Sequence, residues 1–413
     1  MTSTPPGPRS SHIVDPGKEA RSKSGIPIVP VFDGYRAFAI LGVVMLHLIT
    51  ISGVVAADDQ GLLARFTWGA FGRSVEVLFV VSGFVVFLPT VARGGRFGSV
   101  TSYAIRRAAR LLPAYWLILV ISLVLLTTVS TSPEIPFPGG LSIASHFTGL
   151  QVPAALFFDQ IEIGFLVNPP LWTLSVEIIF YVILPLVALH FFRHPLVGLT
   201  VAAAITAVWG LAFSHISDVT SALDLRLSFE EAFRIVLESK LQFPTWAFSF
   251  ALGMTGAWAF MKLRERVDAA GFEQRVAAVQ VASLLATGLF AYLAAGHFSD
   301  TRHSVLLSMG FSASLATLMV AIALGPRSIR LPFSNTPVRR LGDISYGIYL
   351  VHFLMVAYLA ELFSMPTDGT PGAFAVWLVA VMPASVVYGY LSARFLEQPV
   401  RRWARKFGRH RSE

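Results

Sequence analysis

Cysteine is absent from the 413 residues, which excludes disulfides, thiol nucleophiles and cysteine-ligated metals. Charge is scarce as well, since Asp, Glu, Lys and Arg make up only 14% of the chain while hydrophobic residues make up 54%. A soluble protein of this length would need far more polar surface. With a mean hydropathy of +0.65, the sequence predicts an all-α, polytopic membrane bundle.

Several motifs are also missing. The sequence has no glycine-rich phosphate loop, no H-E-x-x-H, no G-x-S-x-G and no His-based metal spacing, so we expect no metal cofactor. No internal repeat is visible, and the second half does not mirror the first as it does in many transporters.

Runs of about 20 apolar residues, the length needed to cross a bilayer, occur ten times. The ten predicted spans are 37–55, 75–91, 111–129, 171–191, 196–213, 243–261, 276–295, 305–324, 344–363 and 374–393.

The distribution of Lys and Arg predicts the orientation of these spans. If the N-terminus is cytoplasmic, 26 of the 32 Lys and Arg residues lie on the cytoplasmic side. This bias predicts that both termini are cytoplasmic, and it explains the net charge of +8 without nucleic acid. We therefore expect a disordered tail over 1–30, a membrane domain over 31–400, and a basic tail over 401–413 that lies near anionic lipid.

The first predicted span contains two unusual residues. Arg36 and His47 are eleven residues apart in FDGYRAFAILGVVMLH. On an α-helix they share one face and lie about 16 Å apart along the axis. Arg36 is then at the cytoplasmic mouth, within pairing distance of Asp33, and His47 is at mid-membrane or beyond. His47 could be a hydrogen-bonding core residue, or it could move a proton near neutral pH.

Three other titratable residues occur in or at the edge of spans and could assist His47. They are Glu76, Glu177 and His352. A carboxylate beside the imidazole would fix its tautomer and stabilise the imidazolium form.

The segment AIRRAARLLPAYW brings arginines to the start of the third span. Arg107 and Arg110 are three residues apart and therefore share a helix face, where forked donors could bind phosphate. The alternative is ordinary positive-inside charge.

These segments together resemble the acyltransferase family 3 membrane proteins. DGYRAFAILGVVMLH is similar to the family's first-span motif, SVEVLFVVSGFVVF to its second span and RRAARLLPAYW to its R-x-x-R element. LWTLSVEIIFYVILPL, LGDISYGIYLVHF and FLEQPVRR resemble later signature segments, in order, up to about residue 402.

The resemblance implies an O-acyltransferase in a bacterial cell membrane that transfers an acyl group, expected to be acetyl, from cytoplasmic acyl-CoA. It matches His47 to the family's essential histidine, Arg36 to the first-span arginine, and Arg107 and Arg110 to the R-x-x-R pair. We expect these three arginines to bind the acyl-CoA phosphates. Two positions depart from the family pattern: Glu76 replaces an aspartate, and the segment after Glu177 lacks a second acidic residue.

The predicted mechanism uses His47 as the base for the acceptor hydroxyl, with Glu76 or Glu177 orienting the ring and Asp33, Tyr349 and His352 as supporting residues. An acyl-histidine intermediate is the alternative chemistry. The expected acceptor is a carbohydrate: a cell-surface glycan, a lipid-linked sugar or a glycosylated metabolite. A proton-coupled transporter, or a non-catalytic receptor or scaffold, could use the same intramembrane charges.

Overall fold

The computed structural model describes residues 26–56, 61–128, 137–161, 163, 168–216, 220, 228–296 and 301–408. In these ranges the chain is helical and no strand is present, which confirms the predicted all-α class. Residues 1–25 of the predicted N-terminal tail and 409–413 of the basic tail lie outside the described residues.

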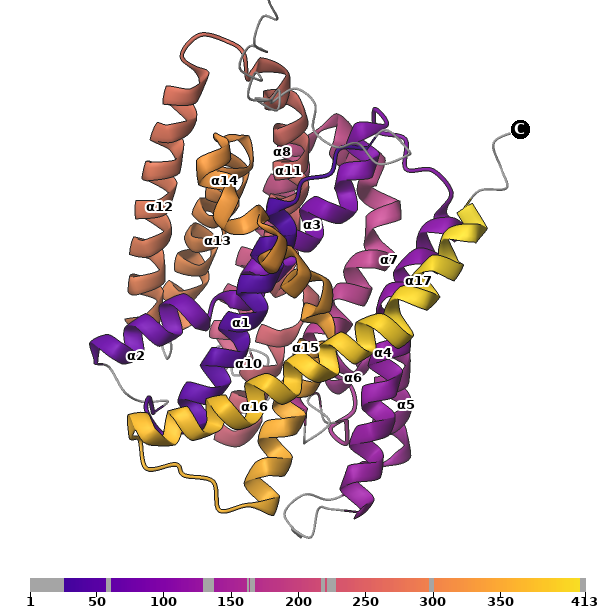
Figure 1. Cartoon of the computed structure of the whole chain (residues 1–413), viewed down its shortest axis with the longest axis vertical. Helices are drawn as coiled ribbons and strands as arrows, with labels where there is room; N and C mark the ends of the chain where they lie inside the picture. Colours follow the sequence, from indigo (N-terminus) through magenta and orange to yellow (C-terminus); the bar gives the residue numbers. More distant parts are fainter. Residues whose placement is uncertain are drawn as a thin grey trace, which may run out of the picture.

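A long helix forms at each predicted span (Figure 1). In the described ranges the long helices are α1 (Val31–Ile51), α3 (Ser74–Ala92), α4 (Val100–Thr128), α7 (Trp172–Arg193), α8 (Pro195–Ser214), α11 (Phe243–Leu263), α12 (Phe272–Gly296), α13 (Thr301–Leu324), α15 (Thr336–Leu362) and α16 (Pro371–Ser392).

Shorter helices connect or extend the long ones. They are α2 (Leu62–Phe66), η1 (Thr67–Phe71), α5 (Gly140–Thr148), α6 (Gln151–Ala155), η2 (Pro169–Leu171), α10 (Phe229–Leu241), η3 (Arg264–Arg266), α14 (Arg327–Ser334), η4 (Ala393–Glu397), α17 (Gln398–Ala404) and η5 (Arg405–Gly408).

Within the described ranges, nine of the long helices are apolar enough to be membrane spans by length and composition, and α11 is not among them. Its 21 residues still give a helix of about 31 Å. α11 packs against α3, α8 and α13, and its sequence mixes Gly, Ser, Thr and Ala with aromatic residues. A β-carbon on Gly253 would collide with the carbonyl oxygen of Val80 in α3. Low hydropathy here therefore reflects a helix that faces protein.

Both ends of the described chain lie at the same end of the bundle. In Figure 1, α1 begins in the upper part of the molecule and α17 ends there, as does the connection between α11 and α12. This arrangement requires an even number of crossings. The nine apolar helices and α11 together satisfy this requirement. The excess of Lys and Arg identifies the upper end as the cytoplasmic side.

Two helices begin well before the predicted spans, by eight residues or more. The helix expected from 111 starts at Val100, and the one expected from 344 starts at Thr336. Hydropathy marks only the apolar part of each helix, and the backbone continues as helix into the polar interface. Arg107 and Arg110 consequently lie inside α4 rather than ahead of it.

Candidate active site

His47 of α1 contacts His352 of α15. Nδ1 of His47 lies 3.0 Å from Nε2 of His352, although 305 residues separate them in sequence. Nδ1 of His352 lies 2.7 Å from the carbonyl oxygen of Tyr349, one turn earlier in α15. His352 is fully buried, whereas His47 is partly exposed.

These contacts determine the tautomer of both rings when both are neutral. A carbonyl oxygen can only accept, so Nδ1 of His352 must carry a hydrogen and its Nε2 must hold a lone pair. Nδ1 of His47 then donates to that lone pair. Nε2 of His47 is left without a hydrogen, and it is the nitrogen that can accept a proton from a substrate.

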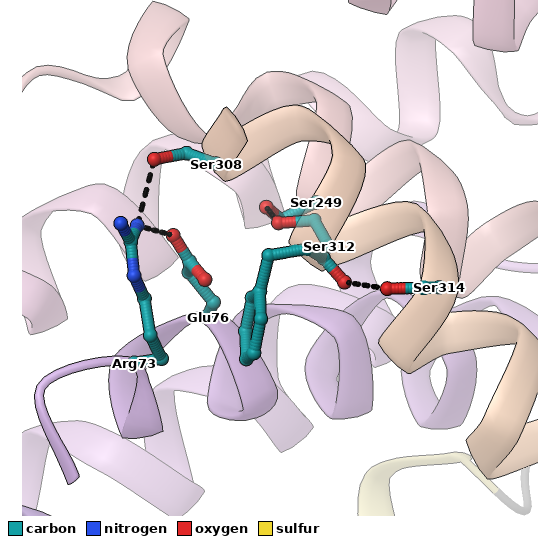
Figure 2. Close-up of polar contacts among 7 residues, drawn as sticks. Arg73, Glu76, Ser249, Ser308, Ser312 and Ser314 are labelled. Atoms are coloured by element: carbon teal, nitrogen blue, oxygen red, sulfur yellow. Dashed lines mark hydrogen bonds and ion pairs between the residues drawn. The ribbon is translucent and has the colours of Figure 1, made fainter. Parts of the chain in front are cut away.

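The two predicted carboxylates lie elsewhere. Within the described residues neither Glu76 nor Glu177 hydrogen-bonds His47, so the ring partner is His352 rather than a carboxylate. Figure 2 shows Glu76 beside Arg73, whose Nη1 lies 2.8 Å from Oε1 of Glu76 and 2.7 Å from Oγ of Ser308. Glu76 is buried, and its other oxygen has no hydrogen-bond partner. Arg73 therefore neutralises Glu76 between α3 and α13. The sequence pattern did not single out Arg73, which lies on the outer side of the membrane.

Glu177 belongs to a narrow cavity between α1, α3, α4, α7 and α15. The cavity has a volume of about 70 Å³, and its polar lining consists of Arg36, Ser82, Arg110, Thr173, Glu177, Ser345, Tyr346 and Tyr349. Four predicted site residues that are far apart in sequence therefore meet at one place: Arg36, Arg110, Glu177 and Tyr349.

Hydrogen bonds fix the walls of this cavity. Glu177 accepts from the hydroxyl groups of Ser82 and Tyr181. The hydroxyl of Tyr349 lies 2.7 Å from Oγ1 of Thr173 and 2.8 Å from the carbonyl oxygen of Pro170. Tyr349 thus joins the cavity wall to the histidine pair, since its backbone carbonyl accepts from His352.

Positive charge gathers at the cytoplasmic end of the cavity. Asp33 lies 3.5 Å from Arg36, and its carboxylate together with Glu177 balances Arg36 and Arg110 electrostatically. Because Arg36 is eleven residues before His47 on the same helix, about 16 Å separates this charge from the histidine pair.

Arg107 points to a neighbouring place rather than into the cavity. Its guanidinium lies over the rings of Tyr103 and Tyr181, 5.8 and 5.6 Å from their centroids. Nε and Nη1 are buried without a hydrogen-bond partner among the described residues. A buried guanidinium with unused donors is expensive unless an anion completes it.

Sequence reasoning missed Thr173 and Tyr346, which line the cavity, although their spacing contained a signal. Thr173 is four residues before Glu177, and Tyr346, Tyr349 and His352 recur every three residues, so each set shares a helix face. Among the described residues, no group of three or more His, Asp or Glu could hold a metal ion.

Comparison with known proteins shows which proteins this chain is similar to. Residues 29–394 match the family model Acyl_transf_3, described as an acyltransferase domain. The peptidoglycan O-acetyltransferase OatA of Listeria monocytogenes is 25% identical over 392 residues, covering 91% of this chain and 56% of the relative.

Two further relatives give the same result. The putative peptidoglycan O-acetyltransferase YrhL of Bacillus subtilis is 25% identical, over 90% of this chain and 55% of the relative. The O-acetyltransferase OatA of Staphylococcus aureus is 24% identical, over 91% and 57% respectively. The chain thus spans a little more than half the length of these relatives. No solved structure matches the chain.

Proposed function

Because the chain belongs to the Acyl_transf_3 acyltransferase family, whose model covers residues 29–394, we propose that it transfers an acetyl group from cytoplasmic acetyl-CoA to a hydroxyl of a cell-envelope carbohydrate. Family membership supports an acyltransferase over the transporter and receptor alternatives. The donor, the acceptor and the residue roles are the proposal.

The histidine pair is the observation that carries the proposal. An alcohol needs a base to attack a thioester, and Nε2 of His47 is the ring nitrogen left unprotonated by the chain of contacts through His352 to Tyr349. When His47 becomes an imidazolium, its Nδ1–H still donates to His352, so the hydrogen bond persists and strengthens as charge develops.

The proposed reaction balances with a single proton on His47. Nε2 removes the hydroxyl proton of the acceptor while its oxygen forms a bond to the thioester carbonyl carbon. The carbon–sulfur bond then breaks, and the proton passes from His47 to the departing sulfur. The products are the O-acetyl ester and free CoA, and His47 returns to its starting tautomer.

The arginines suit the donor. Arg36 and Arg110 line the cytoplasmic end of the cavity and Arg107 holds unused donors nearby. These are the fixed cations that the phosphates of CoA would need. A cavity of about 70 Å³ is smaller than the 300–1,000 Å³ typical of ligand pockets, so the helices must separate along this line for the pantetheine arm to reach His47.

A carbohydrate acceptor agrees with the depth of His47. It lies four residues before the outer end of α1, or about 6 Å along the axis, so an acceptor from the outer side needs only a short approach. The Listeria and Bacillus relatives are named for peptidoglycan, which makes a peptidoglycan sugar the first acceptor to test.

The test uses oriented vesicles that contain the purified chain. Acetyl-CoA with a labelled acetyl group is supplied on the cytoplasmic side and muropeptides on the other, and ester-linked label on the sugar is measured by mass spectrometry. We expect wild-type protein to transfer label and His47→Ala to lose at least 100-fold in rate. Label on the muropeptide at the same rate in both proteins would refute the proposal.

A further inference from the structure

A second, larger cavity lies away from the proposed active site. It has a volume of about 440 Å³ and is formed by α11, α12 and α13 with Leu199 of α8. Aliphatic side chains form most of its wall. In Figure 1, α12 lies at the left edge of the molecule with α13 beside it, and α11 lies farther toward the centre.

The mouth of this cavity is at the cytoplasmic surface. Leu263 ends α11, Phe272 begins α12 and Leu324 ends α13, and all three line the cavity. From Leu324 the lining continues to Ala316, eight residues earlier in α13, which corresponds to a depth of about 12 Å. The cavity is therefore an apolar slot that opens at the level of the lipid headgroups.

Two arginines mark the mouth. Arg266 and Arg275 both line the cavity, one on each side of the turn between η3 and α12. No acidic partner is found for either within the described residues. The same segment contains Glu265, Asp268 and Glu273, but none of these carboxylates lines the cavity.

We infer that this cavity binds the acyl chain of an anionic phospholipid of the cytoplasmic leaflet, with the headgroup phosphate on Arg266 and Arg275. An apolar slot excludes water but accepts hydrocarbon, and two cations at headgroup depth complement a phosphate. The volume of about 440 Å³ is that of a ligand pocket rather than a packing defect. The acyl chain of a lipid without net charge would fill the cavity, but its headgroup would leave Arg266 and Arg275 without a counterion.

The position also indicates a structural consequence. α11 forms one wall of the slot and also packs against α3 and α8, whereas α12 is mainly exposed to the surroundings of the bundle. A lipid tail between α11 and α12 would complete the packing of α12. Binding of such a lipid should therefore raise the melting temperature of the protein.

The experiment uses native mass spectrometry to measure how much dioleoylphosphatidylglycerol the full chain retains in detergent. Dioleoylphosphatidylcholine, which has the same tails but a different headgroup, is the control lipid. The double variant Arg266→Gln with Arg275→Gln removes the proposed phosphate site. Its charge-matched control is Lys262→Gln with Arg327→Gln, two cytoplasmic positions that do not line the cavity.

We expect phosphatidylglycerol to bind the Arg266/Arg275 variant about 30-fold more weakly, equivalent to about 2 kcal/mol for two interfacial cations, and the control variant as tightly as wild type. Phosphatidylcholine should bind wild type no more tightly than phosphatidylglycerol binds the double variant. Equal phosphatidylglycerol binding by both double variants would overturn the inference.

A second arm tests the slot itself. Thr317→Phe from α13, or Ala259→Phe from α11, places a ring in the cavity and should abolish the melting-temperature increase given by phosphatidylglycerol. A retained increase in both variants would show that the lipid binds elsewhere. Oleoyl-CoA and inorganic phosphate are the competitors, and displacement of phosphatidylglycerol by either at equal concentration would assign the slot to a soluble ligand instead.

Discussion

Replacement of His352 offers the sharpest test of the histidine pair. His352→Leu removes the acceptor for Nδ1–H of His47, a contact of 3.0 Å in the interior of the bundle. His47 then keeps a buried donor without a partner, which costs about 1–3 kcal/mol. The ring also loses the contact that fixes its tautomer, so Nε2 is no longer held as the free base.

We expect His352→Leu to lower kcat by about 10- to 100-fold, the usual effect of losing a group that orients a ligand or base. The effect should be smaller than that of His47→Ala, because the base itself remains. His352→Gln is the matched variant. Its side-chain oxygen can accept from His47 and its amide can donate to the carbonyl of Tyr349, so it should recover most of the rate.

The assay follows release of CoA with a thiol reagent. Since the chain contains no cysteine, the signal comes only from the product. KM for acetyl-CoA should stay within about twofold in both variants, because His352 does not line the cavity with the arginines. A His352→Leu protein with wild-type kcat, or a His352→Gln protein as slow as His352→Leu, would refute the assigned tautomers. His47→Ala with His352→Leu should be no slower than His47→Ala alone.

Three further predictions concern the donor site, acid stability and the α3–α11 contact. Arg107→Ala or Arg110→Ala should raise KM for acetyl-CoA by roughly 10- to 150-fold and affect kcat less, because each removes a charge-assisted bond of about 1.5–3 kcal/mol that is remote from the thioester. Replacement by Lys instead of Ala should restore part of the affinity. Unchanged CoA affinity by titration calorimetry in both Ala variants would contradict this role. Burial lowers the pKa of His146 to about 4, so the unfolded chain binds more protons below about pH 6.5. This histidine should contribute a loss of about 2 kcal/mol of stability between pH 7.5 and 5. Melting curves should therefore show a pH slope that is smaller by that amount in His146→Gln than in wild type. Gly253→Val should destabilise the protein by about 1–3 kcal/mol, because the new β-carbon meets the backbone of α3. Gly288→Val in α12 is the control. A β-carbon there meets nothing within 4 Å, so this variant should melt near the wild-type temperature.

The fold was largely predictable because a bilayer imposes a simple rule on sequence. A helix that faces lipid must be apolar over about 20 residues, and each predicted span contains a helix in the structure. Prediction was weakest at the start of α4, because hydropathy does not mark a helix that continues into the polar interface.

The sequence allowed us to predict which residues belong to the site, but not how they are arranged. Intramembrane Arg, His and Glu residues are costly and therefore conspicuous, which is why Arg36, Arg110 and Glu177 could be named before the structure brought them to one cavity. Which side chains contact one another depends on how distant helices pack, and no local pattern specifies that.

The partner of His47 illustrates this limit. A carboxylate was the expected orienting group because it stabilises an imidazolium most strongly, yet the structure places the imidazole of His352 there. Next to lipid a carboxylate carries a desolvation cost that must be offset by a fixed cation, as Arg73 does for Glu76. A second histidine accepts the same hydrogen bond without a charge, and its own Nδ1–H is satisfied within α15 by Tyr349. When both rings are neutral, the pair therefore holds His47 as a base in an apolar bundle, and a net charge is present only while the proton is in transit.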